Sequence, residues 1–162
     1  MSQFIFGEVL FQEEKSFDDI PVVGIDSYPF VLRFQLSQFD FYRRMAPLEY
    51  HVIPFVISDS TLDNTAELVL RNDSISFEAV QGLESYAGLL ALSASERMNM
   101  ISEAIREVLL QLGSKECILV LCDGDMDEFG YTHCAINDLA ETMKRLLDNN
   151  AYCTVANYWV NV

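Results

Sequence analysis

The chain is short of basic residues, glycine and histidine, and each shortage excludes a class of protein. Its 162 residues include 10 Lys plus Arg, 7 Gly and 2 His. Set against a net charge of −15, so few cations argue against nucleic acid and membranes as partners. No glycine belongs to a GxxxxGK[ST] phosphate loop, a GxGxxG dinucleotide turn or a GxSxG nucleophile elbow. Two histidines far apart in sequence exclude a histidine-rich metal centre.

Long apolar runs and paired cysteine motifs are also missing. No stretch approaches the ~18 uninterrupted apolar residues of a membrane helix, and the N-terminal MSQFIFGEVLFQEE lacks the basic region and cleavage site of a signal peptide. The spacing of the cysteines matches neither a zinc knuckle nor a redox pair; they are Cys117, Cys122, Cys134 and Cys153. We therefore expect a cytoplasmic protein with reduced thiols.

What is present is a hydrophobic chain with a strongly acidic balance. Hydrophobic residues make up 51% of the sequence, and 25 Asp plus Glu outnumber the cations. Disorder requires low hydrophobicity together with high charge, so this composition predicts a folded protein. The length suits one hydrophobic core, and we expect a single domain over residues 1–162.

The first half of the sequence has the pattern of β-strands. We expect strands near residues 4–11 (with a kink or bulge at Gly7), 28–37 and 50–57, the last at a sheet edge or bulge because of Pro54. A hairpin is expected over residues 67–80. Together these segments predict an antiparallel meander of about five strands.

The second half changes to a helical period. Ser93 and Glu96 form a capping box before an apolar stripe that ends at Gly113. A buried strand at 117–122, a helix from His133 to Asp148 and a strand at 152–160 then predict a C-terminal βαβ unit. The expected fold is therefore α+β: a mainly antiparallel sheet from the N-terminal half, two helices on one face and the βαβ unit.

The segment CILVLCDGDMDEFG holds the candidate functional residues, because a strand ends there in four carboxylates: Asp123, Asp125, Asp127 and Glu128. The alternating aspartates resemble the start of an EF-hand calcium loop. The sixth position, however, is Glu128 instead of Gly, and the twelfth is Cys134 instead of Glu. Either the carboxylates stay solvated and bind a basic partner, or they hold a divalent cation, the one cofactor that this loop would suit.

We therefore predict an acidic protein-binding module, with no catalytic residues, that contacts a basic protein through Asp123, Asp125, Asp127 and Glu128. An inhibitor or immunity-type protein that neutralises a basic partner is one form of this function. The alternative is a small metal-dependent hydrolase or phosphotransfer domain with Asp123, Asp125 and His133 around the ion. A further alternative is a homodimer that buries exposed aromatic residues.

Overall fold

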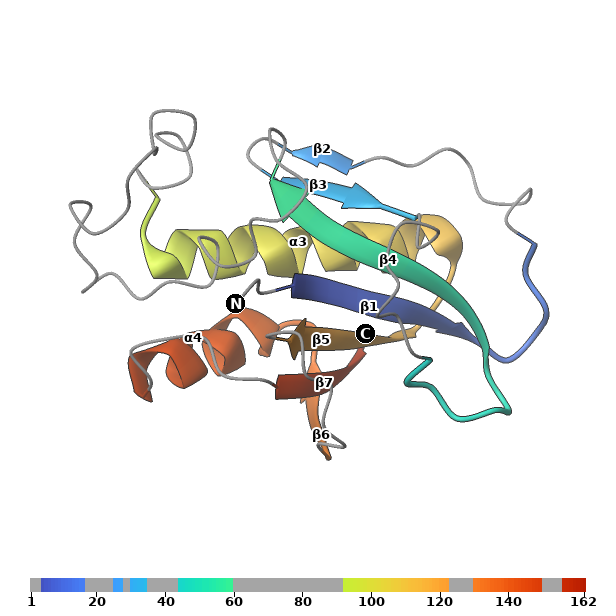
Figure 1. Cartoon of the computed structure of the whole chain (residues 1–162). Coiled ribbons are helices and arrows are strands. Elements are labelled where there is room, and N and C mark those ends of the chain that lie inside the picture. Colours follow the sequence, from blue (N-terminus) through green and yellow to red (C-terminus); the bar gives the residue numbers. More distant parts are fainter. Residues whose placement is uncertain are drawn as a thin grey trace.

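The computed structural model describes residues 4–16, 25–27, 30–34, 44–59, 92–122, 130–149 and 156–162, which form a mixed sheet and two helices (Figure 1). These residues contribute seven strands in the order β2-β3-β4-β1-β5-β7-β6. The strands are β1 (Phe4–Phe11), β2 (Ile25–Ser27), β3 (Phe30–Arg33), β4 (His51–Asp59), β5 (Glu116–Cys122), β6 (Tyr131–Ala135) and β7 (Ala156–Asn161). The helices are α3 (Ala94–Leu112) and α4 (Leu139–Asn149), and the α+β class is confirmed.

Strand β1 lies in the middle of the sheet, antiparallel to β4 on one side and to β5 on the other. The predicted meander, which would have left the first strand at an edge, is therefore wrong in its order, although β1 to β4 are antiparallel as expected. The reason is that β1 carries buried apolar residues on both of its faces, such as Ile5 and Phe6, and both faces need cover. The expected hairpin at 67–80 lies outside the described residues.

Gly7 of β1 allows atoms of the two neighbouring strands to approach its backbone closely. The pairing register runs without a break through Gly7 opposite Phe55 and Leu119, so the predicted bulge is wrong. A Cβ atom at Gly7 would lie 2.4 Å from the Phe55 ring and 2.2 Å from the Ile118 carbonyl oxygen. Glycine is needed here because a neighbouring ring and backbone occupy the space of a side chain.

Pro54 lies in β4, an interior strand, at a position where β4 pairs with β1 but with no described residue of β3. In the described residues β3 pairs with β4 only from Val56 to Asp59, whereas β1 pairs along it from His51 to Ile57. Pro54 is opposite Glu8 of β1. The missing N–H of proline therefore costs no bond to β3, which agrees with the expectation of an edge-like position.

Helix α3 begins and ends as its sequence predicts. The Ser93 hydroxyl accepts a hydrogen bond from the Glu96 N–H at 3.2 Å, and the Glu96 carboxylate accepts one from the Ser93 N–H at 2.8 Å. These bonds with Ser93 lower the pKa of Glu96. Gly113 ends the helix with φ 66°, a left-handed conformation that glycine adopts without strain.

The C-terminal βαβ unit exists, but its first strand is β6 instead of β5. Strands β6 and β7 are parallel and joined through α4, whereas β5 is antiparallel to β7. The helix predicted from His133 begins at Leu139, and His133 belongs to β6. The short run YTHCA favours a strand through Tyr131 and Thr132, a preference that the helical stripe after it concealed.

The sheet has two faces with different cover. On the helix face, alternate strand residues join one cluster with both helices, including Ile5, Val9, Phe55, Leu119, Ile101 and Leu139. On the opposite face, which we call the aromatic face, a smaller cluster contains Phe6, Leu10, Val56, Ile118 and Val120, with Tyr50, Tyr131 and Trp159 against it. Neither helix in the described part of the chain is long and apolar enough to cross a bilayer.

Candidate partner-binding surface

The four predicted contact residues, Asp123, Asp125, Asp127 and Glu128, lie outside the described residues. The structure does place the two points between which they run. The chain leaves β5 at Cys122 and enters β6 at Tyr131, and β7 lies between these two strands in the sheet. Leu121 pairs with Ala156 and Tyr131 with Asn157, so both anchor points flank the first residues of β7.

Trp159 of β7 is the centre of an aromatic cluster close to these anchor points. The rings of Tyr50 and Tyr131 meet it edge-on, with ring centroids 5.6 and 5.5 Å away. The imidazole of His133 stacks on it at 5.7 Å, with 25° between the planes. Edge-to-face and stacked arrangements at such distances are favourable. Side chains from three segments that are separated in sequence therefore pack together around Trp159.

The Trp159 indole is half-buried, and its polar edge is occupied. Its Nε1 donates a hydrogen bond of 3.3 Å to Oε1 of Glu116, the first residue of β5. That bond fixes the orientation of the indole in the aromatic face. Partly exposed aromatic rings held in one orientation lose little side-chain entropy on binding, which is why Trp and Tyr dominate the energetics of protein interfaces.

A buried carboxylate holds the segment that carries Tyr50. Glu8 of β1 is fully buried on the aromatic face, and its two oxygens accept hydrogen bonds from the backbone N–H groups of Met45 at 3.0 Å and Ala46 at 2.7 Å. A buried charge is tolerated when hydrogen bonds satisfy it. Glu8 therefore fastens residues 45–46 to the centre of the sheet.

Arg44 and Tyr131 complete this fastening. The Arg44 guanidinium donates to the backbone carbonyls of Ala46 at 3.1 Å and Pro47 at 2.8 Å, and also to that of Tyr50. The Tyr131 hydroxyl donates to the Met45 carbonyl at 2.6 Å. Burial, and secondarily the negative charge of Glu8, raise the pKa of Tyr131, so the phenol keeps its proton and remains a donor.

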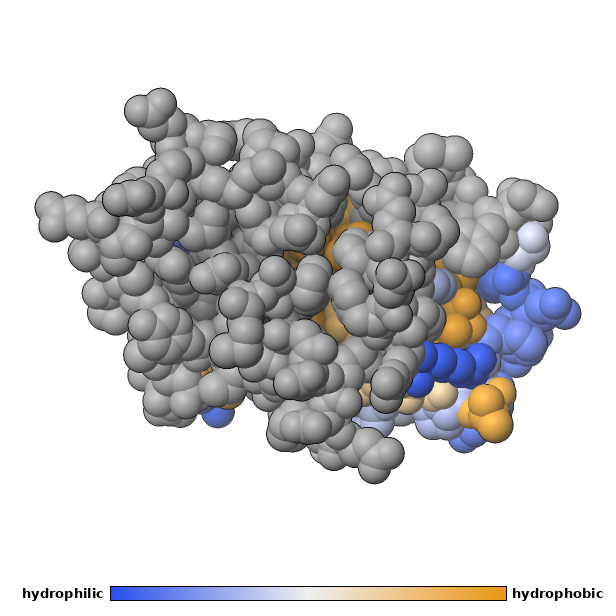
Figure 2. Space-filling view, viewed as in Figure 1, coloured by the Kyte–Doolittle hydropathy of each residue, from blue (hydrophilic) through white to orange (hydrophobic). Residues whose placement is uncertain are grey.

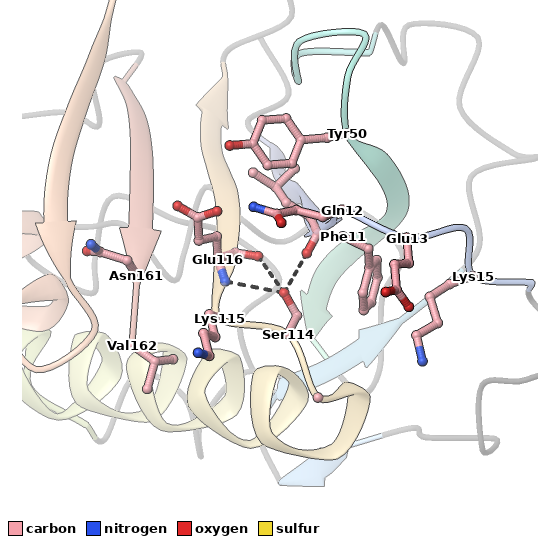
Figure 3. A pocket seen from close by; sticks show the side chains of 12 residues that line it. Phe11, Gln12, Glu13, Lys15, Tyr50, Ser114, Lys115, Glu116, Asn161 and Val162 are labelled. Atoms are coloured by element: carbon pink, nitrogen blue, oxygen red, sulfur yellow. Dashed lines mark hydrogen bonds between the residues drawn. The ribbon is translucent and has the colours of Figure 1, made fainter.

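An open hollow of about 620 Å³ adjoins the cluster and shares Tyr50 and Glu116 with it (Figure 3). At its floor the Ser114 hydroxyl lies 2.6 Å from the Leu10 carbonyl oxygen and 3.0 Å from that of Glu116. Its charged lining is mixed, with Glu13 and Glu116 facing the same space as Lys15 and Lys115. The described surface at this end is largely hydrophilic (Figure 2).

Of the three residues in the metal-site alternative, the structure describes His133 alone. It is an exposed residue of β6 stacked on Trp159, and no group of three or more His, Cys, Asp or Glu side chains suited to a metal exists among the described residues. Asp123 and Asp125, the other two proposed ligands, are outside the described ranges. The structure thus brings His133 together with aromatic rings.

Sequence reasoning missed Glu8, Tyr131 and Trp159, although two signals were visible. Glu8 is the only charge within the apolar run FIFGEVLF, and a charged residue in a central strand needs a partner. Trp159 is the single tryptophan of the chain. The pairing of β6 with β7, which joins His133 to Trp159, had no such signal.

No family model matches this sequence, no curated protein is significantly similar to it, and no solved structure gives a significant match to its fold. The function is therefore argued from the chemistry of this surface.

Proposed function

We propose that the protein is an acidic protein-binding module that recognises a basic protein partner, as an inhibitor or immunity-type protein does. The observation that carries the proposal is the fixed, half-exposed Trp159 cluster in a chain of net charge −15. Aromatic faces attract Lys and Arg side chains through cation–π contacts, and the negative field of the whole chain steers basic partners toward it.

The four carboxylates between β5 and β6 are the proposed contacts that act together with this cluster. Asp123 directly follows Cys122, the last residue of β5, and Glu128 precedes Tyr131, the first residue of β6, by three positions in the sequence. Carboxylates among the contact residues would speed association with a basic partner and make it sensitive to salt.

A reducing, cytoplasmic location accords with the two cysteines whose side chains the structure describes. Cys117 and Cys134 are both free thiols. Burial raises the pKa of Cys117, and burial followed by the charge of Asp138 raises that of Cys134. Neither thiol is activated as a nucleophile, which favours binding over cysteine catalysis as the function.

The single tryptophan provides the experiment. An eight-residue peptide of alternating valine and arginine is titrated into the protein, and Trp159 fluorescence is followed at low and high salt. We expect a saturable change in the wild type. Neutralising the loop (Asp123→Asn, Asp125→Asn, Asp127→Asn, Glu128→Gln) should weaken binding about tenfold at low salt.

A matched control removes four negative charges elsewhere. Glu13, Glu14, Glu103 and Glu107 are exposed, and their joint change to Gln alters the net charge by the same amount. This control should lower affinity several-fold less than the loop variant does. If the two variants lose affinity equally, or neither loses any, the loop is not the contact surface and the proposal fails.

A further inference from the structure

Strand β6 ends the sheet and leaves one of its two edges unpaired in the described part of the chain. It pairs with β7 and with no other described strand. Three of its five residues are exposed, namely Thr132, His133 and Ala135. The strand contains no charged residue and no proline, two devices that protect sheet edges from pairing with another chain.

The opposite edge of the sheet differs in this respect. Strand β2 has only three described residues. A very short edge strand is a poor template for a further strand. Of the two edges formed by described strands, β6 is therefore the one suited to accept an extended chain.

The hydrogen-bond pattern shows which backbone groups of β6 face outward. The Ile136 N–H donates to the Asn161 carbonyl of β7 at 2.8 Å. Because successive backbone groups of a strand point to opposite sides, those of Thr132 and Cys134 also point toward β7, and those of Tyr131 and His133 point away from it. The Ala135 carbonyl accepts from the Asp138 N–H, so the outward groups available to a partner are those of Tyr131 and His133 and the N–H of Ala135.

From this edge we infer a docking mode: an extended, basic segment of a protein partner adds to the sheet as a strand alongside β6. The inference rests on the proposed function and specifies the partner as a strand-forming segment with alternating basic side chains. Its side chains on the aromatic face would lie next to Tyr131 and His133, whose rings contact Trp159. Main-chain hydrogen bonds would supply affinity, and these rings would select the side chains.

Charge favours a basic segment over a second copy of this chain. Asp138 and Glu141 are exposed just beyond the end of β6, and the charge of Asp138 is already felt at Cys134 within the strand. Two copies paired through β6 would each bring a net charge of −15 to the contact, and like charges across an interface are unfavourable.

The first test removes hydrogen-bond donors from the probe and leaves the protein unchanged. The octapeptide of alternating valine and arginine is compared with the same peptide N-methylated at every residue, which has equal charge but no N–H to donate from either of its edges. We expect the methylated peptide to bind at least tenfold more weakly. Equal affinity of the two peptides overturns the inference.

The second test changes one position of β6 in two ways. His133→Pro removes an outward N–H, a change that an edge strand tolerates, and His133→Ala removes only the imidazole. Thermal unfolding and circular dichroism establish that both variants fold. We expect the Pro variant to lose at least tenfold in affinity and the Ala variant to lose less than threefold; equal losses overturn the inference, and if the Pro variant does not fold, the methylated peptide decides.

The outcomes separate this inference from the proposed function. If the loop neutralisation weakens binding but neither methylation nor His133→Pro does, the basic-partner function stands and strand addition is overturned. If loop neutralisation and its control act equally, the proposed function itself fails. Sedimentation equilibrium adds one outcome: a wild-type dimer that His133→Pro dissociates would assign the edge to a second copy and overturn the inference.

Discussion

The helix face and the aromatic face of the sheet are made by alternate residues of the same strands, yet their chemistry differs. In β1 the residues Ile5, Val9 and Phe11 join both helices in an aliphatic core. Between them, Glu8 points to the other side, where its carboxylate is buried under the backbone of residues 45–46. One face is held by apolar contact, and the other combines apolar contact with charged and aromatic hydrogen bonding.

The helix face consists of side chains that only stabilise the fold, whereas the aromatic face also contains partly exposed groups. Close-packed aliphatic side chains stabilise a fold but offer a partner nothing to recognise. A half-buried indole bonded to Glu116, with tyrosines at its edges, is held in place and is partly exposed. The aromatic face therefore contributes both to the fold and to the proposed binding surface, and three substitutions test the comparison.

Gly7→Ala should have the largest effect, because it breaks the fit of the helix face. The added Cβ would overlap the Phe55 ring and the Ile118 carbonyl, neither of which can move without disturbing the sheet. Overpacking of this kind costs about 3 kcal/mol, to be measured by chemical denaturation. Gly130→Ala is the control, since no atom lies within 4 Å of a Cβ there; an equal loss for both glycines would contradict the explanation.

Glu8→Gln should have an intermediate effect and act on the aromatic face. The amide retains one acceptor oxygen, but its NH₂ group would face a backbone N–H that now has no acceptor. A lost hydrogen bond to a buried charged group costs about 2 kcal/mol. The exposed Glu14→Gln change serves as the reference for charge removal. If both variants unfold at the same denaturant concentration, Glu8 does not fasten residues 45–46.

Tyr131→Phe should have the smallest effect on stability, about 1 kcal/mol for the bond to the Met45 carbonyl. It should also change the dependence on pH. Because the folded pKa of Tyr131 is raised, the folded state retains a proton that the unfolded state releases above about pH 10. Stability from this group is complete below that pH and is lost as the pH rises through the folded pKa.

The Phe variant should therefore show a flatter loss of stability in alkali than the wild type. Chemical denaturation at several pH values between neutrality and strong alkali measures this difference. Combined with Glu8→Gln, the loss should be less than additive, because both groups hold the same segment. Identical alkaline profiles for wild type and variant would exclude Tyr131 as the titrating group.

Local signals in the sequence predicted local structure accurately. The capping box at Ser93 and the stop at Gly113 gave both ends of α3, since a cap depends only on residues three or four positions apart. The apolar run at 117–122 became β5. Helix α4 was predicted to begin six residues too early, because the five residues of β6 are too few to show a period of their own.

Features that depend on distant segments were not predicted. Gly7 was interpreted as a kink or bulge, because only the position of Phe55 in the neighbouring strand shows why a side chain is excluded. The predicted strand order of the meander was wrong for the same reason. Strand order depends on which strand faces must be buried, and β1 has apolar residues on both of its faces. His133 was predicted at the start of a helix and instead lies in β6, where it stacks on a tryptophan 26 positions away.

By itself, the sequence determined the α+β class, the position of α3 and the acidic composition from which we propose a basic partner. These follow from composition and from short-range periodicity, which are properties of neighbouring residues. Only the tertiary structure decided that β6 lies at the sheet edge, that Trp159 lies against Tyr50, Tyr131 and His133, and that Glu8 fastens residues 45–46. Those contacts arise when strands pair, and pairing is chosen by the burial of whole faces, which no single segment specifies.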